Sequence, residues 1–294
     1  MTSTLVQHRP HAASASSAQA CERARDWAEI QERMLVPLYE AVYERLEVGA
    51  GSRLLGLGCG SGLALLIAAA RGAAVSGTDT NRERLALASE RLTADGSAAQ
   101  SARLFEGGAR AAADPALPLY NLITVFQPIG CRAGDADGLG AALRGAVPLA
   151  ERGSAVVLTG WGPPERCASS AVLRVAEGHS GRTRPDGGTP PTHGRQAVGG
   201  VRWRPALRDD LEDVAARAGL RPDGSGRVAC PFGYADVDSA VRGLLSTGLY
   251  DAAVAESDQG QVEKEITEAL HPHVRPDGTV WMPNVFRYLI TRTP

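Results

Sequence analysis

The stretch 52-SRLLGLGCGSGLALL-66 carries four glycines at alternate positions between two apolar runs. The first run, Arg53–Leu57, predicts a strand and the second, Leu63–Ala70, predicts a helix. Glycines between a strand and a helix let backbone N–H groups and the helix N-terminus approach a ligand closely, because no Cβ blocks the way. No register of these glycines gives the G-x-G-x-x-G spacing of dinucleotide sites. The stretch therefore predicts a loop for a nucleotide-like ligand of another class.

Strand and helix patterns alternate along the rest of the chain. Further strands are expected at Ala73–Thr78, Ala102–Phe105, Asn121–Phe126, Ala155–Thr159 and Val285–Thr291. Further helices are expected at Arg82–Leu92, Leu139–Leu149, Ala206–Ala218, Asp236–Ser246 and Val262–Leu270. Such alternation predicts an α/β protein with a doubly wound, mostly parallel sheet.

The N-terminal part predicts a lead-in and a cap. Residues 1–20 are polar and small, which favours disorder. From Cys21 to Leu46 apolar residues recur at helical spacing, and Pro37 predicts a kink. We expect one domain over residues 21–294, covered by cap elements at 21–48, 161–204 and 231–280. Within the second of these, the Gly/Pro/Arg-rich stretch that begins at residue 178 predicts a loop or lid.

Composition argues against several classes of partner. The chain has 294 residues, a net charge of −2 and a single lysine, so no basic surface for nucleic acid or membrane is expected. No apolar run reaches the roughly 20 residues of a membrane span, and no signal peptide is recognisable. The five cysteines form no C-x-x-C pair, which predicts reduced thiols in a cytoplasmic protein and no metal site.

The glycine spacing resembles motif I of the class I S-adenosylmethionine (SAM) methyltransferases. The resemblance extends to Asp79 at the end of the second strand, to 119-LYNLITVFQPIG-130, to 155-AVVLTGWGPPE-165 and to a final antiparallel strand, 284-NVFRYLITR-292. The segment 26-DWAEIQERMLVPLYEAV-42 resembles the N-terminal cap helix of actinobacterial small-molecule methyltransferases. The resemblance implies a seven-stranded Rossmann-like sheet and SAM, or its product S-adenosylhomocysteine (SAH), as cofactor.

The same resemblance implies a set of site residues. In it, Asp79 accepts the ribose hydroxyls, although that carboxylate would also suit the cap of the following helix. Cofactor-binding residues are expected to be Gly58, Cys59, Gly60, Gly62, Asp79, Thr80, Gly108, Ala109, Phe126 and Gln127. Trp27, Met34 and Trp161 are candidates for substrate binding, and His179, His193 and Tyr250 are candidates for a general base, with no spacing that singles one out. The arginines of the 182–204 stretch either meet an acidic substrate or form a solvated loop.

Three positions depart from the family pattern. Gly56 stands where the first strand ends in Asp or Glu, Gly108 where an Asp holds the adenine, and Asn121 where an Asp often precedes the fourth strand. SAM carries a net charge of about +1 near neutral pH, whereas SAH is neutral. Each lost carboxylate removes a charge-assisted contact of roughly 1.5–3 kcal/mol. The sequence therefore predicts weak SAM binding and poor discrimination against SAH.

Methyl transfer to a small molecule, in natural-product biosynthesis, is the function expected from this resemblance. The alternative is a non-methylating enzyme on the same fold, such as a cyclase that closes a ring by displacing SAH from a substrate-linked sulfonium. A nicotinamide-dependent oxidoreductase is disfavoured by the glycine spacing and by the absence of a Tyr-x-x-x-Lys pair. A binding protein without turnover is the remaining class. The substrate, the modified atom and the oligomeric state stay open.

Overall fold

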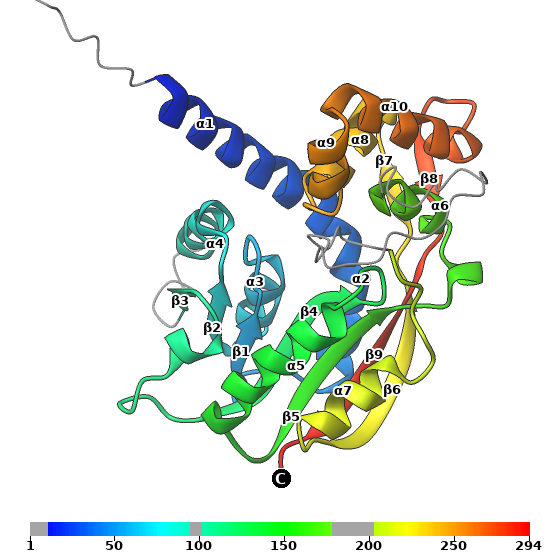
Figure 1. Cartoon of the computed structure of the whole chain (residues 1–294). Coiled ribbons are helices and arrows are strands. Elements are labelled where there is room, and N and C mark those ends of the chain that lie inside the picture. Colours follow the sequence, from blue (N-terminus) through cyan, green and yellow to red (C-terminus); the bar gives the residue numbers. More distant parts are fainter. Residues whose placement is uncertain (1–10, 95–101, 178–202) are drawn as a thin grey trace, which may run out of the picture.

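A seven-stranded sheet forms the centre of the computed structural model, which describes residues 11–94, 102–177 and 203–294. Its strands follow the order β3-β2-β1-β4-β5-β9-β6 (Figure 1). β9 runs antiparallel to β5 and β6, and the other neighbouring strands are parallel. The bounds are β1 Arg53–Leu57, β2 Ala74–Asp79, β3 Arg103–Glu106, β4 Tyr120–Ile129, β5 Ala150–Trp161, β6 Arg221–Ala229 and β9 Val285–Arg292. The predicted α/β class and mostly parallel sheet are confirmed.

Helices cover both faces of the sheet, because successive strand side chains point to opposite sides. Leu54 of β1 joins a buried apolar cluster with residues of α2, α3 and α4, and its neighbour Leu55 joins a second cluster with residues of α5 and α7. The helices of the first face are α2 Val36–Arg45, α3 Leu63–Ala70 and α4 Arg82–Ala94; those of the second are α5 Asp135–Ala146 and α7 Asp210–Arg217.

A helical cap lies over the end of the sheet where the parallel strands finish (Figure 1). It consists of α6 Ser170–Leu173, α8 Val237–Leu245, α9 Asp251–Glu256, α10 Gln259–Leu270 and a two-stranded ribbon, β7 Phe232–Tyr234 with β8 Val280–Met282. Asp79 at the end of β2 and Ser246 after α8 line one cavity, so cap and sheet meet at this edge. None of the helices in the described ranges is long and apolar enough to cross a membrane.

The N-terminal segment is helical but irregular. Helix α1, His11–Asp26, continues into a π-helical turn at Trp27–Gln31 and a 3-10 turn at Glu32–Leu35, which lead into α2. The irregular turns end at Leu35, close to Pro37, which lies in the first turn of α2, where a missing N–H costs no hydrogen bond. Residues 11–20, expected to be disordered, belong to α1, and their alanines favour a helix.

Candidate functional site

The loop between β1 and α3 is built on glycines in left-handed backbone conformation. The φ angle is +61° at Gly58, +57° at Gly60 and +77° at Gly62. A residue with a Cβ loses roughly 1–2 kcal/mol in this conformation, so the loop geometry depends on glycine. The Cys59 N–H ties the loop to β2 by donating to the carbonyl of Thr78 at 2.9 Å. Burial raises the pKa of the Cys59 thiol to about 12, which makes it a packing residue at neutral pH.

Asp79 fixes this loop from the neighbouring strand. Its side chain is 5% exposed, and Oδ2 accepts the Gly60 N–H while Oδ1 accepts the Asn81 N–H, both at 2.8 Å. The cap of α4 is Asn81, whose Oδ1 accepts the Arg84 N–H at 2.8 Å. Asp79 therefore does not cap the helix. Each of its oxygens has capacity for a further donor from the cavity that Asp79 lines.

Close packing of α3 on the sheet explains why position 56 is a glycine. Gly56 pairs in register with Gly77 of β2. A Cβ at Gly56 would lie 2.9 Å from Leu65 Cδ2, and a Cβ at Gly77 would lie 2.6 Å from Leu65 Cδ1 and 2.7 Å from Cys59 Sγ. Leu65 is 1% exposed, so its side chain fills the space over both glycines. An acidic side chain at position 56 would point into this apolar contact.

The other two departures lie at opposite ends of the sheet. Gly108 follows β3 at the ligand end, and a Cβ added there meets no atom within 4 Å. Asn121 is the second residue of β4, at the far end, where Oδ1 accepts the Arg53 N–H at 2.8 Å and Nδ2 donates to the Gly51 carbonyl at 2.9 Å. Counting Asn121 among the missing ligand carboxylates is therefore wrong. Its amide joins β4 to the start of β1, a role that needs both a donor and an acceptor.

Two side chains of the protein take up the space over the loop. A Cβ on Gly60 would lie 2.2 Å from Cη2 of Trp27, and a Cβ on Gly58 would lie 2.2 Å from Nε2 of Gln127. Trp27 comes from the π-helical turn and Gln127 from β4. The cavity left over the loop measures about 30 Å³, which has room for about two waters. A ligand that approaches these glycines must displace the indole and the amide.

A buried carboxylate that the sequence did not indicate lies beside the same loop. Glu32 is 2% exposed, and it accepts hydrogen bonds from the Ser61 hydroxyl and from Arg91 Nη1, the latter at 3.0 Å. Arg91 Nη1 also donates to Ser61 Oγ at 2.6 Å. Burial raises the pKa of Glu32, although its hydrogen bonds to Ser61 and the Arg91 charge oppose the rise. Only tertiary packing brings Glu32 and Arg91 together, since Glu32 lies in the 3-10 turn before α2 and Arg91 lies on α4.

A cavity of about 550 Å³ opens beside Asp79, between the sheet, α1, α4 and the cap. This volume lies within the range of small-molecule sites, roughly 300–1,000 Å³. Asp79, Thr80 and Gln127 contribute to it from the strand ends. Arg23 of α1 and Asp251 of α9 face it and form an ion pair that joins the N-terminal helix to the cap. Three residues expected at a cofactor site thus share one cavity.

The other aromatic and apolar candidates pack into the core. The Phe126 ring is 9% exposed and lies 4.7 Å from that of Tyr39. The Trp161 ring lies 4.5 Å from that of Phe286, in an aromatic cluster under the cap. Met34 is partly buried against the same core. Of these, Phe126 lines the small cavity over the glycine loop.

Tyr250, the candidate for a general base that lies within the described residues, receives no support from its surroundings. Tyr250 is fully buried, its hydroxyl donates to the Val172 carbonyl at 3.2 Å, and burial raises its pKa far above the ordinary value. It packs the cap together. His179 and His193 lie outside the described residues. Ala109, expected near the adenine, has its side chain in the core of the α5 face. Within the described ranges, no three His, Cys, Asp or Glu side chains are grouped as a metal site.

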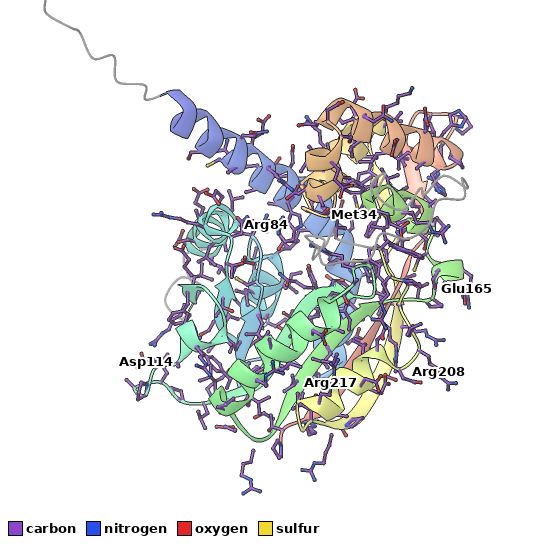
Figure 2. The ribbon with its side chains drawn as sticks, viewed as in Figure 1. Met34, Arg84, Asp114, Glu165, Arg208 and Arg217 are labelled. Atoms are coloured by element: carbon purple, nitrogen blue, oxygen red, sulfur yellow. The ribbon has the colours of Figure 1, made fainter. Side chains whose placement is uncertain are left out.

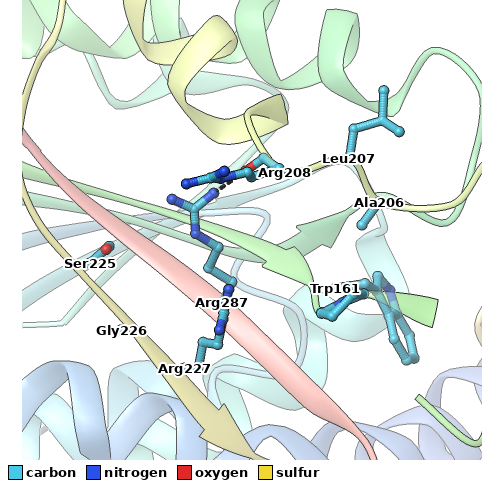
Figure 3. Close-up of a pocket in the computed structure, with 10 residues that line it drawn as sticks. Trp161, Ala206, Leu207, Arg208, Ser225, Gly226, Arg227 and Arg287 are labelled. Carbon is cyan, nitrogen blue, oxygen red and sulfur yellow. Dashed lines mark hydrogen bonds between the residues drawn. The ribbon is translucent and has the colours of Figure 1, made fainter. Parts of the chain in front are cut away.

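A second cavity, of about 450 Å³, lies between α7, β6 and the start of β9 (Figure 3). Arg208, Arg227 and Arg287 line it together with Trp161. Arg287 is neutralised by Glu212, whose Oε2 accepts from Nη1 at 2.8 Å, and the same Nη1 donates to the Arg208 carbonyl at 2.5 Å. The two cavities share no lining residue. The arginine-lined cavity is therefore separate from the site around Asp79.

Comparison with known proteins supports the fold assignment. No family model matches the sequence. A stretch of 70 residues is 41% identical to methyltransferase GfsG of Streptomyces halstedii, and the match spans 24% of this chain and 24% of that protein. A SAM-dependent methyltransferase from Thiobacillus denitrificans, solved in complex with SAH, superposes with a TM-score of 0.52 at 16% identity, over 97% of this chain and 100% of that chain. The [4+2]-cyclase SpnF superposes with a TM-score of 0.50 at 16% identity, over 87% and 80%. The chain has the fold of the class I SAM-dependent methyltransferases.

Proposed function

We propose that this protein is a SAM-dependent methyltransferase that acts on a small molecule in natural-product biosynthesis. The observation that carries the proposal is Asp79, a nearly buried carboxylate that is fixed at the strand end by two backbone N–H groups and lines a cavity of ligand size. Vicinal hydroxyl groups, such as those of a ribose, are donors suited to the oxygens of a carboxylate. The local likeness to a Streptomyces methyltransferase adds support for the natural-product setting.

The cavity beside Asp79 has room for an adenosyl ligand, whereas the space over the glycine loop is filled by a side chain that must move. Thr80 and Gln127 flank the cavity, and the open space at Gly108 leaves room beyond β3. Over Gly60, the indole of Trp27 must move before the amino-acid end of the cofactor can approach the backbone. When bound, SAM supplies an electrophilic methyl group to a nucleophile of the substrate, and SAH leaves. The protein's part is to hold both molecules in line and to exclude water, for which the cap of the 21–294 domain is suited.

A second candidate is a non-methylating enzyme, such as a cyclase, that uses the same pocket. The observation that favours it is the lack of a carboxylate at Gly56 and Gly108, which leaves the positive charge of SAM less well matched. The two candidates share the ligand site and differ in whether the methyl group moves.

Calorimetric titration of the full chain with SAM and with SAH tests the shared part of the proposal. At least one ligand is expected to bind, and Asp79→Asn is expected to weaken that binding at least tenfold through loss of a charged acceptor. Asp213→Asn removes an exposed carboxylate from α7 and serves as the matched control. If neither ligand binds, or if both variants behave alike, the proposal fails. Transfer of a labelled methyl group to candidate small molecules then distinguishes the methyltransferase from the cyclase.

A further inference from the structure

Arg84 lies over the candidate site and joins three parts of the protein. It sits in the first turn of α4, shortly after Asp79 (Figure 2). Its guanidinium carbon lies 4.0 Å from the centre of the Trp27 ring, and Nη2 donates to the Ser246 carbonyl at 2.8 Å. Arg84 also lines the cavity of about 550 Å³ beside Asp79. One cation is thus held between the sheet edge, the N-terminal segment and the cap.

Charges at this site are balanced within the protein. Two carboxylates, Asp79 and Glu32, are buried beside the glycine loop, and both interact favourably with the Arg84 charge. Arg91, two turns further along α4, forms the ion pair with Glu32. With the Arg23–Asp251 ion pair on the cavity wall, three negative groups therefore face three positive ones. A cationic ligand therefore gains no net electrostatic attraction here, whereas the binding of a neutral ligand does not depend on such attraction.

The aromatic ring of Trp27 at this site is also occupied by a group of the protein. An indole face is the best cation-binding surface among aromatic side chains, worth about 0.5–2 kcal/mol to a cation. Trp27 lies against Gly60, and its ring carries the guanidinium of Arg84. A sulfonium that enters the site must compete with Arg84 for this ring and meets its positive charge as well.

We propose that Arg84 determines the charge selectivity of the site, so that SAH is held at least as tightly as SAM. This inference rests on the proposed function, namely that an adenosyl ligand binds beside Asp79. The guanidinium acts in two ways. Its positive charge repels the sulfonium of SAM, and its stacking on Trp27 leaves that ring face unavailable to the sulfonium.

The protein does not satisfy every hydrogen-bond donor of Arg84. Its Nε–H is buried and has no acceptor within the described structure, and burial lowers the pKa of the guanidinium. A buried donor without a partner is unfavourable for folding. Arg84→Met keeps the length and apolar contacts of the side chain while it removes the charge, so the variant is expected to fold.

The test is the ratio of SAM affinity to SAH affinity, measured by calorimetric titration of the full chain. Arg84→Met is expected to raise this ratio about tenfold in favour of SAM. Arg84→Lys retains the charge and is expected to stay near the wild-type ratio. Arg82→Met removes an exposed positive charge from the same helix and is the matched control, with the ratio unchanged.

Two results overturn the inference while the proposed function stands. One is a wild-type protein that binds SAM more tightly than SAH; the other is an Arg84→Met ratio equal to that of Arg82→Met while both ligands bind. If neither ligand binds the wild type or any variant, the proposed function itself fails. Ligand-induced shifts in melting temperature give the same ratio independently, because a ligand that binds only the folded state raises the free energy of unfolding by RT ln(1 + [L]/Kd).

Discussion

Gly56→Asp restores the family's carboxylate at the end of β1, and we expect it to destabilise the protein without improving SAM binding. The new Cβ would lie 2.9 Å from Leu65 Cδ2, so Leu65 must shift within a filled core, at a cost of about 1–3 kcal/mol. The carboxyl group would enter an apolar contact, where burial without a partner costs at least about 2 kcal/mol. The free energy of unfolding should fall by roughly 3–6 kcal/mol in total. Thermal unfolding followed by circular dichroism should show a melting temperature lower by roughly 6–20 °C.

Gly51→Asp is the control for this substitution, because a Cβ at Gly51 meets no atom within 4 Å. That variant should stay within about 0.5 kcal/mol of the wild type. The double variant of Gly56→Asp with Leu65→Ala removes the obstructing side chain, so the two changes should couple favourably by about 1 kcal/mol or more. If Gly56→Asp matches Gly51→Asp in stability and binds SAM more tightly, the carboxylate turns toward the ligand and the packing argument is refuted.

Three further substitutions test other parts of the site. Gly60→Ala should be destabilised by about 1–3 kcal/mol more than Gly219→Ala in urea unfolding, because both have positive φ but only the first collides with the indole; equal losses would contradict the placement of that ring. Asn121→Asp loses a donor to a backbone carbonyl, so it should lower stability by about 0.5–1.5 kcal/mol and leave ligand affinity unchanged; a change in affinity would return this residue to the site. The raised pKa of Glu32 means that the unfolded state ionises first as pH rises above the ordinary value of 4.5, so wild-type stability falls with pH over that window. Glu32→Gln should remove that part of the slope in unfolding measured from pH 4 to 8, and an unchanged slope would contradict the assignment.

The periodic parts of the fold could be predicted from the sequence. Glycine spacing placed the loop at Gly58–Gly62, and apolar runs located β1, β2, β4, β5 and β9, since those strands are buried on both faces. Strand β6 gave no such signal. Its sequence, RPDGSGRVA, is rich in polar and flexible residues, and it lies at an edge of the sheet where only β9 pairs with it. Residues 221–229 therefore form a strand because their backbone hydrogen-bonds to β9, and not because of their own sequence pattern.

The candidate site was predictable only where one short stretch defines it. Gly60 and Asp79 meet as expected, because parallel strands end at the same edge. Glu32 and Arg84 were not foreseen, since their positions depend on how an irregular helical segment packs against α4. The family pattern also misled at Asn121, because a residue that precedes a parallel strand lies at the end of the sheet opposite the ligand.

The place of β9 in the sheet has a consequence for the order of folding. Strands β1 to β5 come from the first 161 residues and pair with one another in parallel, so they can form a sheet that already contains Asp79 and the glycine loop. Among the described strands, β6 pairs with β9 alone, and β9 is the last strand in the chain. Contacts between such distant segments form slowly.

Until β9 docks, β5 presents a bare hydrogen-bonding edge, and such edges favour aggregation. Substitutions that weaken β9 should therefore lower the yield of refolded protein before they change its ligand affinity. An adenosyl ligand present during refolding would stabilise the early half of the sheet by mass action and shorten the exposure of that edge.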